Sequence, residues 1–194
     1  MQRRLIVGIT GASGVVYGQR LLQALARLEI ETHLVLTRSA ALTITYELDQ
    51  PVDAIKALAS KVHPINDVGA SIASGSFKTE GMIIAPCSMH TLAAIATGVC
   101  DNALTRAADV VLKERRRLVL LVRETPLHLG HLRNMTAVTE MGAIVSPPVP
   151  AFYSKPKTIE ALVDHTIGRA LDLFDLDSET VTRWRENDPP SREE

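Results

Sequence analysis

Small and hydroxyl-bearing residues form a tight turn near the start of the chain. The turn has the sequence G-I-T-G-A-S-G over residues 8–14, between a short apolar run and a helical pattern. Backbone N–H groups at a helix start, together with the positive end of the helix dipole, bind phosphate well. Thr10 replaces the second glycine of a dinucleotide-binding G-x-G-x-x-G turn, and the lysine of a P-loop is absent. The turn therefore predicts either a phosphate site or an ordinary strand-to-helix turn.

A second candidate is the sequence P-C-S-M-H-T at residues 86–91, which also follows an apolar run. Ser88 is placed to cap the helix that follows, and its neighbours would offer amides and hydroxyls to a ligand. Ordinary capping explains the same residues without a ligand. Cys87 has the chemistry of a nucleophile, but no histidine stands at a fixed spacing from it, so we expect a small buried thiol.

Charged and aromatic residues in the second half of the chain form a third group. Arg123 and Glu124 directly follow the apolar run at residues 118–122. A guanidinium and a carboxylate there would hold an anion and move a proton, or would form a surface ion pair of little consequence. Tyr153 lies in a proline-flanked loop and Arg169 in the helical pattern after it. A packed aromatic and a solvated charge are the alternatives for these two.

The elements that must position these residues follow from hydrophobic periodicity. Apolar runs predict strands at residues 3–9, 31–36, 81–85, 118–122 and 143–145, with Pro86 ending the third of them. Helical patterns occupy residues 15–28, a stretch ending at 45, and residues 52–59, 88–97, 101–116, 129–141, 158–174 and 178–185.

Apolar strands that alternate with helices predict an α/β fold with a three-layer, doubly wound parallel sheet of the flavodoxin or Rossmann type. Ligands bind such sheets at the carboxyl ends of the strands. The candidate residues at 10–14, 86–91 and 123–124 each follow a predicted strand, as do residues 37–39. We therefore expect them at one edge of the sheet.

Length and composition limit the remaining possibilities. The chain has 194 residues, of which 46% are hydrophobic, which suits one domain at residues 1–186; residues 187–194 are expected to form a disordered tail. A net charge of −1, from 21 basic and 22 acidic residues, leaves no polycationic surface for nucleic acid. The cysteines lack CxxC spacing and the histidines are scattered, so we expect no metal.

No apolar run approaches the roughly 20 residues that span a bilayer. The apolar run near the N-terminus is also too short for a signal peptide. The sequence thus predicts a cytoplasmic protein without a membrane span.

Five motifs in order resemble the UbiX/Pad-type flavin prenyltransferases. They are G-I-T-G-A-S-G, P-C-S-M-H-T-L-A, T-R-A-A-D-V-V-L-K-E-R-R, V-R-E-T-P-L and P-P-V-P-A-F-Y, and the resemblance extends from Leu5 to about Trp184. One departure is Arg117, where the family usually has proline. Thr37 stands where serine is usual and keeps the hydroxyl.

The resemblance implies a reaction. Reduced FMN would receive a dimethylallyl group from dimethylallyl monophosphate without a metal, with bonds to flavin N5 and C6. The product, prenylated FMN, is the cofactor of UbiD-type decarboxylases, which in many bacteria serve ubiquinone biosynthesis. The family assembles as trimers stacked into dodecamers, and we expect a homo-oligomer here.

The resemblance also implies site residues. It assigns FMN binding to Gly11, Ala12, Ser13, Thr37, Ser88, Met89, His90, Thr91 and Arg123. It assigns the prenyl phosphate to Ser13, Lys113, Tyr153 and Arg169. Catalytic roles fall on Glu47, Lys113, Glu124, Tyr153 and Arg169, and we hypothesise that Glu47 and Glu124 tune proton transfer. Residues 73–76 match further active-site positions, and Trp184 matches an aromatic that helps to close the site.

Two alternative functions share this fold class. An FMN-dependent cysteine-type decarboxylase shares the fold but carries P-x-M-N after a central strand, where this chain has P-C-S-M. A non-catalytic FMN-binding module of the electron-carrier type would usually stack aromatics on the flavin, and only 4% of this chain is aromatic.

Overall fold

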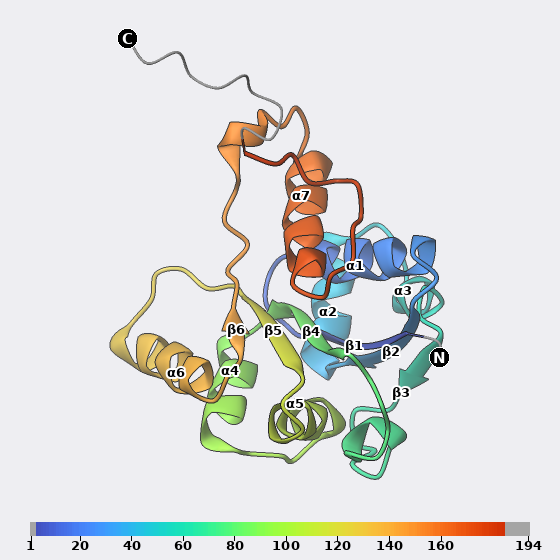
Figure 1. Cartoon of the computed structure of the whole chain (residues 1–194), viewed down its shortest axis with the longest axis vertical. Coiled ribbons are helices and arrows are strands. Elements are labelled where there is room, and N and C mark those ends of the chain that lie inside the picture. The colour runs from blue at the N-terminus through green and yellow to red at the C-terminus, as the bar shows by residue number, and fades with distance from the viewer. Residues whose placement is uncertain (1–2, 185–194) are drawn as a thin grey trace.

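A parallel sheet of six strands crosses the molecule, which is described for residues 3–184 by a computed structural model (Figure 1). Its strands lie in the order β3-β2-β1-β4-β5-β6. They are β1 (Arg4–Ile9), β2 (Glu31–Leu36), β3 (Lys61–His63), β4 (Gly81–Cys87), β5 (Arg117–Val122) and β6 (Ile144–Val145). The order reverses between β1 and β4, as in the doubly wound Rossmann sheet. The sheet thus belongs to the predicted doubly wound class. Of the flavodoxin and Rossmann types that the sequence left open, its strand order is that of the Rossmann type.

Helices cover both faces of the sheet (Figure 1). One face packs against α1 (Val15–Arg27), α2 (Arg38–Glu47), α3 (Val52–Lys56) and α7 (Ile159–Asp172). The other packs against α4 (Met89–Thr97), α5 (Ala103–Lys113) and α6 (Leu129–Glu140). Side chains alternate along β1, so that Leu5 and Val7 join the first core while Ile6 joins the second. This confirms the three layers.

Two strand predictions differ from the structure. β4 continues through Pro86 to Cys87 instead of ending at Ala85. Its register against β5 shifts between Ile84 and Cys87, and such an irregularity accommodates a residue without an N–H donor. β3 was not predicted, because three residues at the sheet edge are too few to show a period.

The predicted helix at residues 178–185 is wrong over its described part. Residues 178–184 are not helical. Here the Glu179 N–H donates to Asp177 Oδ1 at 2.9 Å, a local bond that competes with helix formation. The Thr180 hydroxyl donates to the carbonyl oxygen of Asp164 in α7. Residues 173–184, called the return segment below, therefore run back along α7.

The carboxyl ends of the strands meet at one edge of the sheet, where the turns after β1, β2, β4 and β5 lie. Short helical turns at Ser71–Ala73 and Phe152–Ser154 complete the described structure. None of the helices within residues 3–184 is long and apolar enough to cross a membrane. The predicted tail at residues 187–194 lies outside the described residues.

Candidate functional site

The turns after β1 and β2 touch at Gly11. A Cβ atom on Gly11 would lie 2.4 Å from the Cβ of Ser39, so only glycine permits this approach. Thr37 caps α2 by accepting from the Ala40 N–H, and its hydroxyl lies 3.1 Å from that of Ser39. The turn that contains Gly11, Ala12 and Ser13 is thereby held beside the predicted Thr37 hydroxyl.

Thr10 joins the turn after β1 to the turn after β4. Its hydroxyl donates to the Pro86 carbonyl at 2.7 Å and accepts from the Ser88 N–H at 2.8 Å. The side chain is fully buried. Ser88 in turn caps α4 by accepting from the Thr91 N–H. The sequence places Thr10 among the hydroxyls of the candidate phosphate turn, but it gives no local signal for this bridge between two turns.

A cavity of about 400 Å³ opens at this edge of the sheet, a size in the range of small-molecule sites. It is lined by four of the predicted residues, namely Thr37, Ser88, His90 and Thr91. Arg38 and Ser39 also line it, as expected for residues 37–39 at this edge, and so do Asn102 and Thr105, which were not predicted. The position of Arg38 and Ser39 directly after a strand is the signal that identifies them. The cavity therefore offers many hydroxyls and one guanidinium, a donor set suited to a phosphate ester.

The predicted residues beside this cavity come from the neighbouring turns. Met89 opens α4 and packs against the second core. Arg123 follows β5, and its N–H donates to the Cys87 carbonyl. Burial raises the pKa of the Tyr17 hydroxyl, and the charge of Arg123 opposes that shift. Glu124 accepts from the N–H of the next residue at 2.9 Å.

Cys87 is buried within β4. Burial raises the pKa of its thiol to about 12. A neutral, enclosed thiol is a poor nucleophile, so the expectation of a small buried thiol is confirmed.

Glu47 lies at the end of α2 and caps another helix. Its Oε2 accepts from the N–H groups of Gly14 at 2.8 Å and Val15 at 3.1 Å. These are amides at the start of α1, where the sequence predicted a phosphate. A carboxylate of the chain itself occupies them, so any phosphate contact in this turn falls to residues 11–13.

Tyr153 is not among the residues that line the cavity, and it packs against α7 and the return segment. Its ring meets those of His165 and Trp184 edge-on, with centroids 5.7 Å and 5.4 Å away. The structure thus brings the Tyr153 loop and Trp184 into contact, a pairing that was not predicted.

Arg169 follows His165 by one turn of α7, so both side chains leave the same face of the helix. It donates to Asp172 Oδ2 at 2.6 Å, and Arg183 of the return segment also pairs with Asp172. Hydrogen bonds from Arg183, more than the charge and bonds of Arg169, hold the pKa of the Asp172 carboxyl below its usual range. Tyr153, His165, Arg169 and Trp184 are called the α7 corner below.

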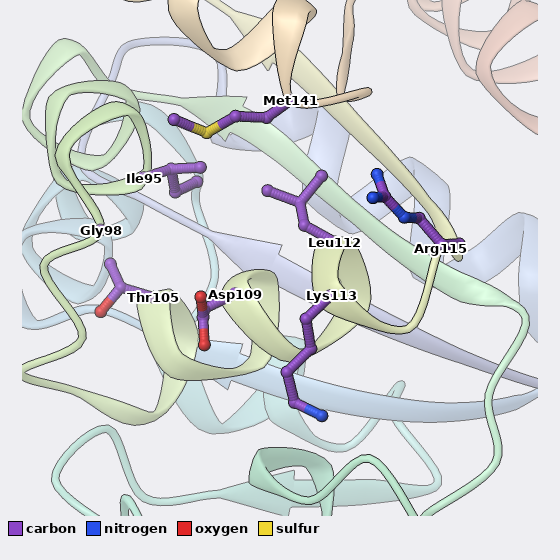
Figure 2. A pocket seen from close by; sticks show the side chains of 8 residues that line it. All are labelled: Ile95, Gly98, Thr105, Asp109, Leu112, Lys113, Arg115 and Met141. Carbon is purple, nitrogen blue, oxygen red and sulfur yellow. The ribbon is translucent and has the colours of Figure 1, made fainter.

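Lys113 lies at the amino ends of the strands, opposite to the carboxyl-edge cavity. It ends α5 just before β5 begins, about 12 Å along the helix from the cavity-lining Thr105. Lys113 pairs with Glu114, and the backbone at Gly75 passes close to both. A cavity of about 350 Å³ lies here between α4, α5 and Met141 (Figure 2). The structure thus does not bring Lys113 and Ser13 together within one chain.

The predicted site residues therefore fall into three places on one chain. These are the carboxyl-edge cavity and its turns, the α7 corner, and the end of α5. No group of three or more His, Cys, Asp or Glu within residues 3–184 is arranged to hold a metal ion.

Comparisons with known proteins find flavoproteins by family model, by sequence and by structure. The family model described as Flavoprotein matches residues 1–181. A relative from Thauera aromatica, named flavin prenyltransferase UbiX, is 57% identical over 95% of each chain.

Two solved structures are similar throughout. That of AnUbiX (PadA1) in complex with FMN and dimethylallyl pyrophosphate has a TM-score of 0.94 and 55% identity, over 95% of this chain and 98% of that one. That of a dodecameric FMN-dependent UbiX-like decarboxylase from Escherichia coli O157:H7 has a TM-score of 0.91 and 49% identity, over 93% and 98%.

Proposed function

This chain belongs to the UbiX family of flavin prenyltransferases, and we propose that its carboxyl-edge cavity and its α7 corner hold the two substrates of that reaction. The chain transfers a prenyl group to FMN. The observation that carries this function is full-length similarity to a solved protein that holds both FMN and a prenyl donor.

FMN fits the carboxyl-edge cavity. Gly11 lets the turn after β1 approach Ser39, which lines the cavity, and Thr37, Ser88 and Thr91 line it as well. Arg38 adds a positive charge for the FMN phosphate. Arg123 and Met89 lie at the neighbouring turns, within the same edge. When bound, reduced FMN supplies the nucleophilic ring atoms, which by the resemblance are N5 and C6.

The α7 corner receives the phosphate of the prenyl donor. An allylic phosphate leaves only if its growing negative charge is stabilised by donors fixed before the reaction. Arg169 offers a guanidinium anchored by Asp172, and Tyr153 offers a hydroxyl held between two rings. Each well-aimed donor of this kind is worth roughly 3 kcal/mol of barrier. Trp184 covers Tyr153 and would keep water from the allylic group.

Lys113 completes the phosphate site from another copy of the chain. Within one chain it lies at the wrong edge of the sheet to reach Ser13. The UbiX-like structure from Escherichia coli is dodecameric, and a homo-oligomer of this chain, built from trimers, would place a neighbour's Lys113 at the site. Glu124 lies in the turn after β5 and is proposed to accept a proton, whereas Glu47 is proposed to support the start of α1.

The product, prenylated FMN, is proposed to serve a UbiD-type decarboxylase. Dimethylallyl monophosphate is proposed as the prenyl donor, because the family resemblance implies a donor with a single phosphate and assigns that phosphate to Ser13, Lys113, Tyr153 and Arg169. The solved relative holds the pyrophosphate, so both donors belong in the test.

Mass spectrometry of the flavin tests this function. Purified protein is incubated without metal with reduced FMN and either dimethylallyl monophosphate or dimethylallyl pyrophosphate. The mass of the flavin is then measured. We expect FMN to gain one C5 unit with the monophosphate. Unchanged FMN with both donors would overturn the function, and a decarboxylated cysteine peptide in a parallel reaction would favour the cysteine-type alternative. If FMN gained the C5 unit only with the pyrophosphate, the assignment of the monophosphate as the donor would be overturned, but the prenyl transfer itself would stand.

A further inference from the structure

His165 is a buried histidine at the centre of the α7 corner. Only 5% of its surface is exposed. Its Nε2 lies 3.4 Å from the hydroxyl oxygen of Tyr153 and 3.4 Å from the carbonyl oxygen of Thr182 in the return segment. One ring nitrogen thus faces two oxygens that belong to two different segments.

The chemistry of the two oxygens decides where the proton lies. The Thr182 carbonyl only accepts hydrogen bonds, so Nε2 must carry a hydrogen for that contact to be favourable. A protonated Nε2 then donates toward the Tyr153 oxygen as well. The phenolic hydrogen of Tyr153 cannot point at a donor, and it must therefore turn away from His165.

We propose that His165 is a positioning residue that aims the Tyr153 hydroxyl: by donating to its oxygen, His165 leaves the phenolic hydrogen free to donate to the phosphate of the prenyl donor. The inference rests on the proposed function, which places that phosphate beside Tyr153. A hydroxyl aimed before the donor binds needs no reorientation as the leaving group gains charge.

Packing alone would not need a nitrogen at this position. The ring of His165 meets Tyr153 at 83°, an arrangement that phenylalanine would reproduce. Trp184 supports the other side of Tyr153 at 87°. A phenylalanine at 165 therefore keeps the ring contact and removes only the donor, which separates aiming from packing.

A double-mutant cycle between residues 165 and 153 tests the proposal. We measure kcat/KM for the prenyl donor in full-length wild type, His165→Phe, Tyr153→Phe and the double variant. His165→Phe should lose about 10-fold, and it should lose almost nothing further once Tyr153→Phe has removed the hydroxyl. His165→Gln keeps an N–H donor and should stay within about 3-fold of wild type.

Control measurements distinguish a failure of the proposed role of His165 from a failure of the proposed prenyl transfer. Affinity for FMN should be equal in all four proteins, because His165 lies away from the carboxyl-edge cavity. Losses that simply add in the double variant, or equal losses in His165→Phe and His165→Gln, would overturn the role of His165 while wild-type turnover still supports the function. Full activity in Tyr153→Phe would overturn both this role and the assignment of Tyr153 to the phosphate.

Discussion

The carboxylate of Glu47 accepts a hydrogen bond from the N–H of Gly14 at 2.8 Å, which joins the end of α2 to the start of α1. Gly14 has a φ of 99°, in the left-handed region that favours glycine. Since Gly14 has no side chain to cap α1, Glu47 supplies the missing acceptor from another helix. A negative charge is also favourable at this end of the helix dipole.

Neutralising Glu47 should therefore weaken the fold near the first turn. Glu47→Gln keeps one acceptor oxygen but loses the charge, and we expect a loss of about 0.5–1 kcal/mol. Thermal unfolding should show a midpoint lower by about 1–4 °C. Glu124→Gln is the matched control, because within residues 3–184 the Glu124 carboxylate bonds only the N–H of its own neighbour. Equal midpoints in the two variants would argue against the cap.

Gly11→Ala should weaken FMN binding. The added Cβ would lie 2.4 Å from that of Ser39, so one of the two turns must move. We expect at least about a 10-fold weaker Kd for FMN, measured by fluorescence titration. Adding Ser39→Gly removes the clashing atoms and should restore part of the affinity. A double variant as weak as Gly11→Ala would show that Ser39 is not the obstacle.

Thr10→Val should destabilise the link between the turns after β1 and β4. Valine has nearly the same shape, but it leaves the Ser88 N–H without its acceptor and leaves the Pro86 carbonyl with only the backbone N–H of residue 10 as a donor, at 3.3 Å. A buried group left unpaired costs about 1–3 kcal/mol, which urea unfolding would detect. Thr10→Ser keeps the hydroxyl and should lose less. The reverse ranking of the two variants would contradict the role of this hydroxyl.

The ion pairs of Asp172 should make the free energy of unfolding decrease as the pH becomes acidic. Its folded pKa lies below the ordinary value of 3.8 because Arg183 and Arg169 bond the carboxylate. A depressed pKa contributes stability above the unfolded value and loses it as pH falls through the folded one. Urea unfolding between about pH 5 and pH 3 should therefore show a shallower loss for Asp172→Asn than for wild type. Parallel curves would exclude Asp172 as a source of the slope.

Much of the fold followed from local pattern. Strands such as β2 and β5 and helices such as α1 have strong periods and clear ends, so sequence placed them within a residue or two. β3 and the return segment were missed or wrong, because their structure depends on partners distant in the chain. The extension of β4 through Pro86 likewise depends on pairing with β5.

The candidate site was predictable in part. Residues that follow strands, such as Ser88 and Thr37, came together because all parallel strands end at one edge. The cap by Glu47, the bridge by Thr10 and the contact of His165 with Tyr153 join distant segments and leave no local signal. The family resemblance supplied Lys113, and the structure shows that one chain does not bring it to Ser13.

A crystal structure of the oligomer with FMN and dimethylallyl monophosphate tests the central claim most directly. We predict the FMN phosphate in the carboxyl-edge cavity, among Thr37, Ser88 and Arg38, and the donor phosphate within hydrogen-bonding distance of Tyr153 and Arg169. A donor phosphate bound elsewhere, with the α7 corner empty and remote from the flavin, would contradict it.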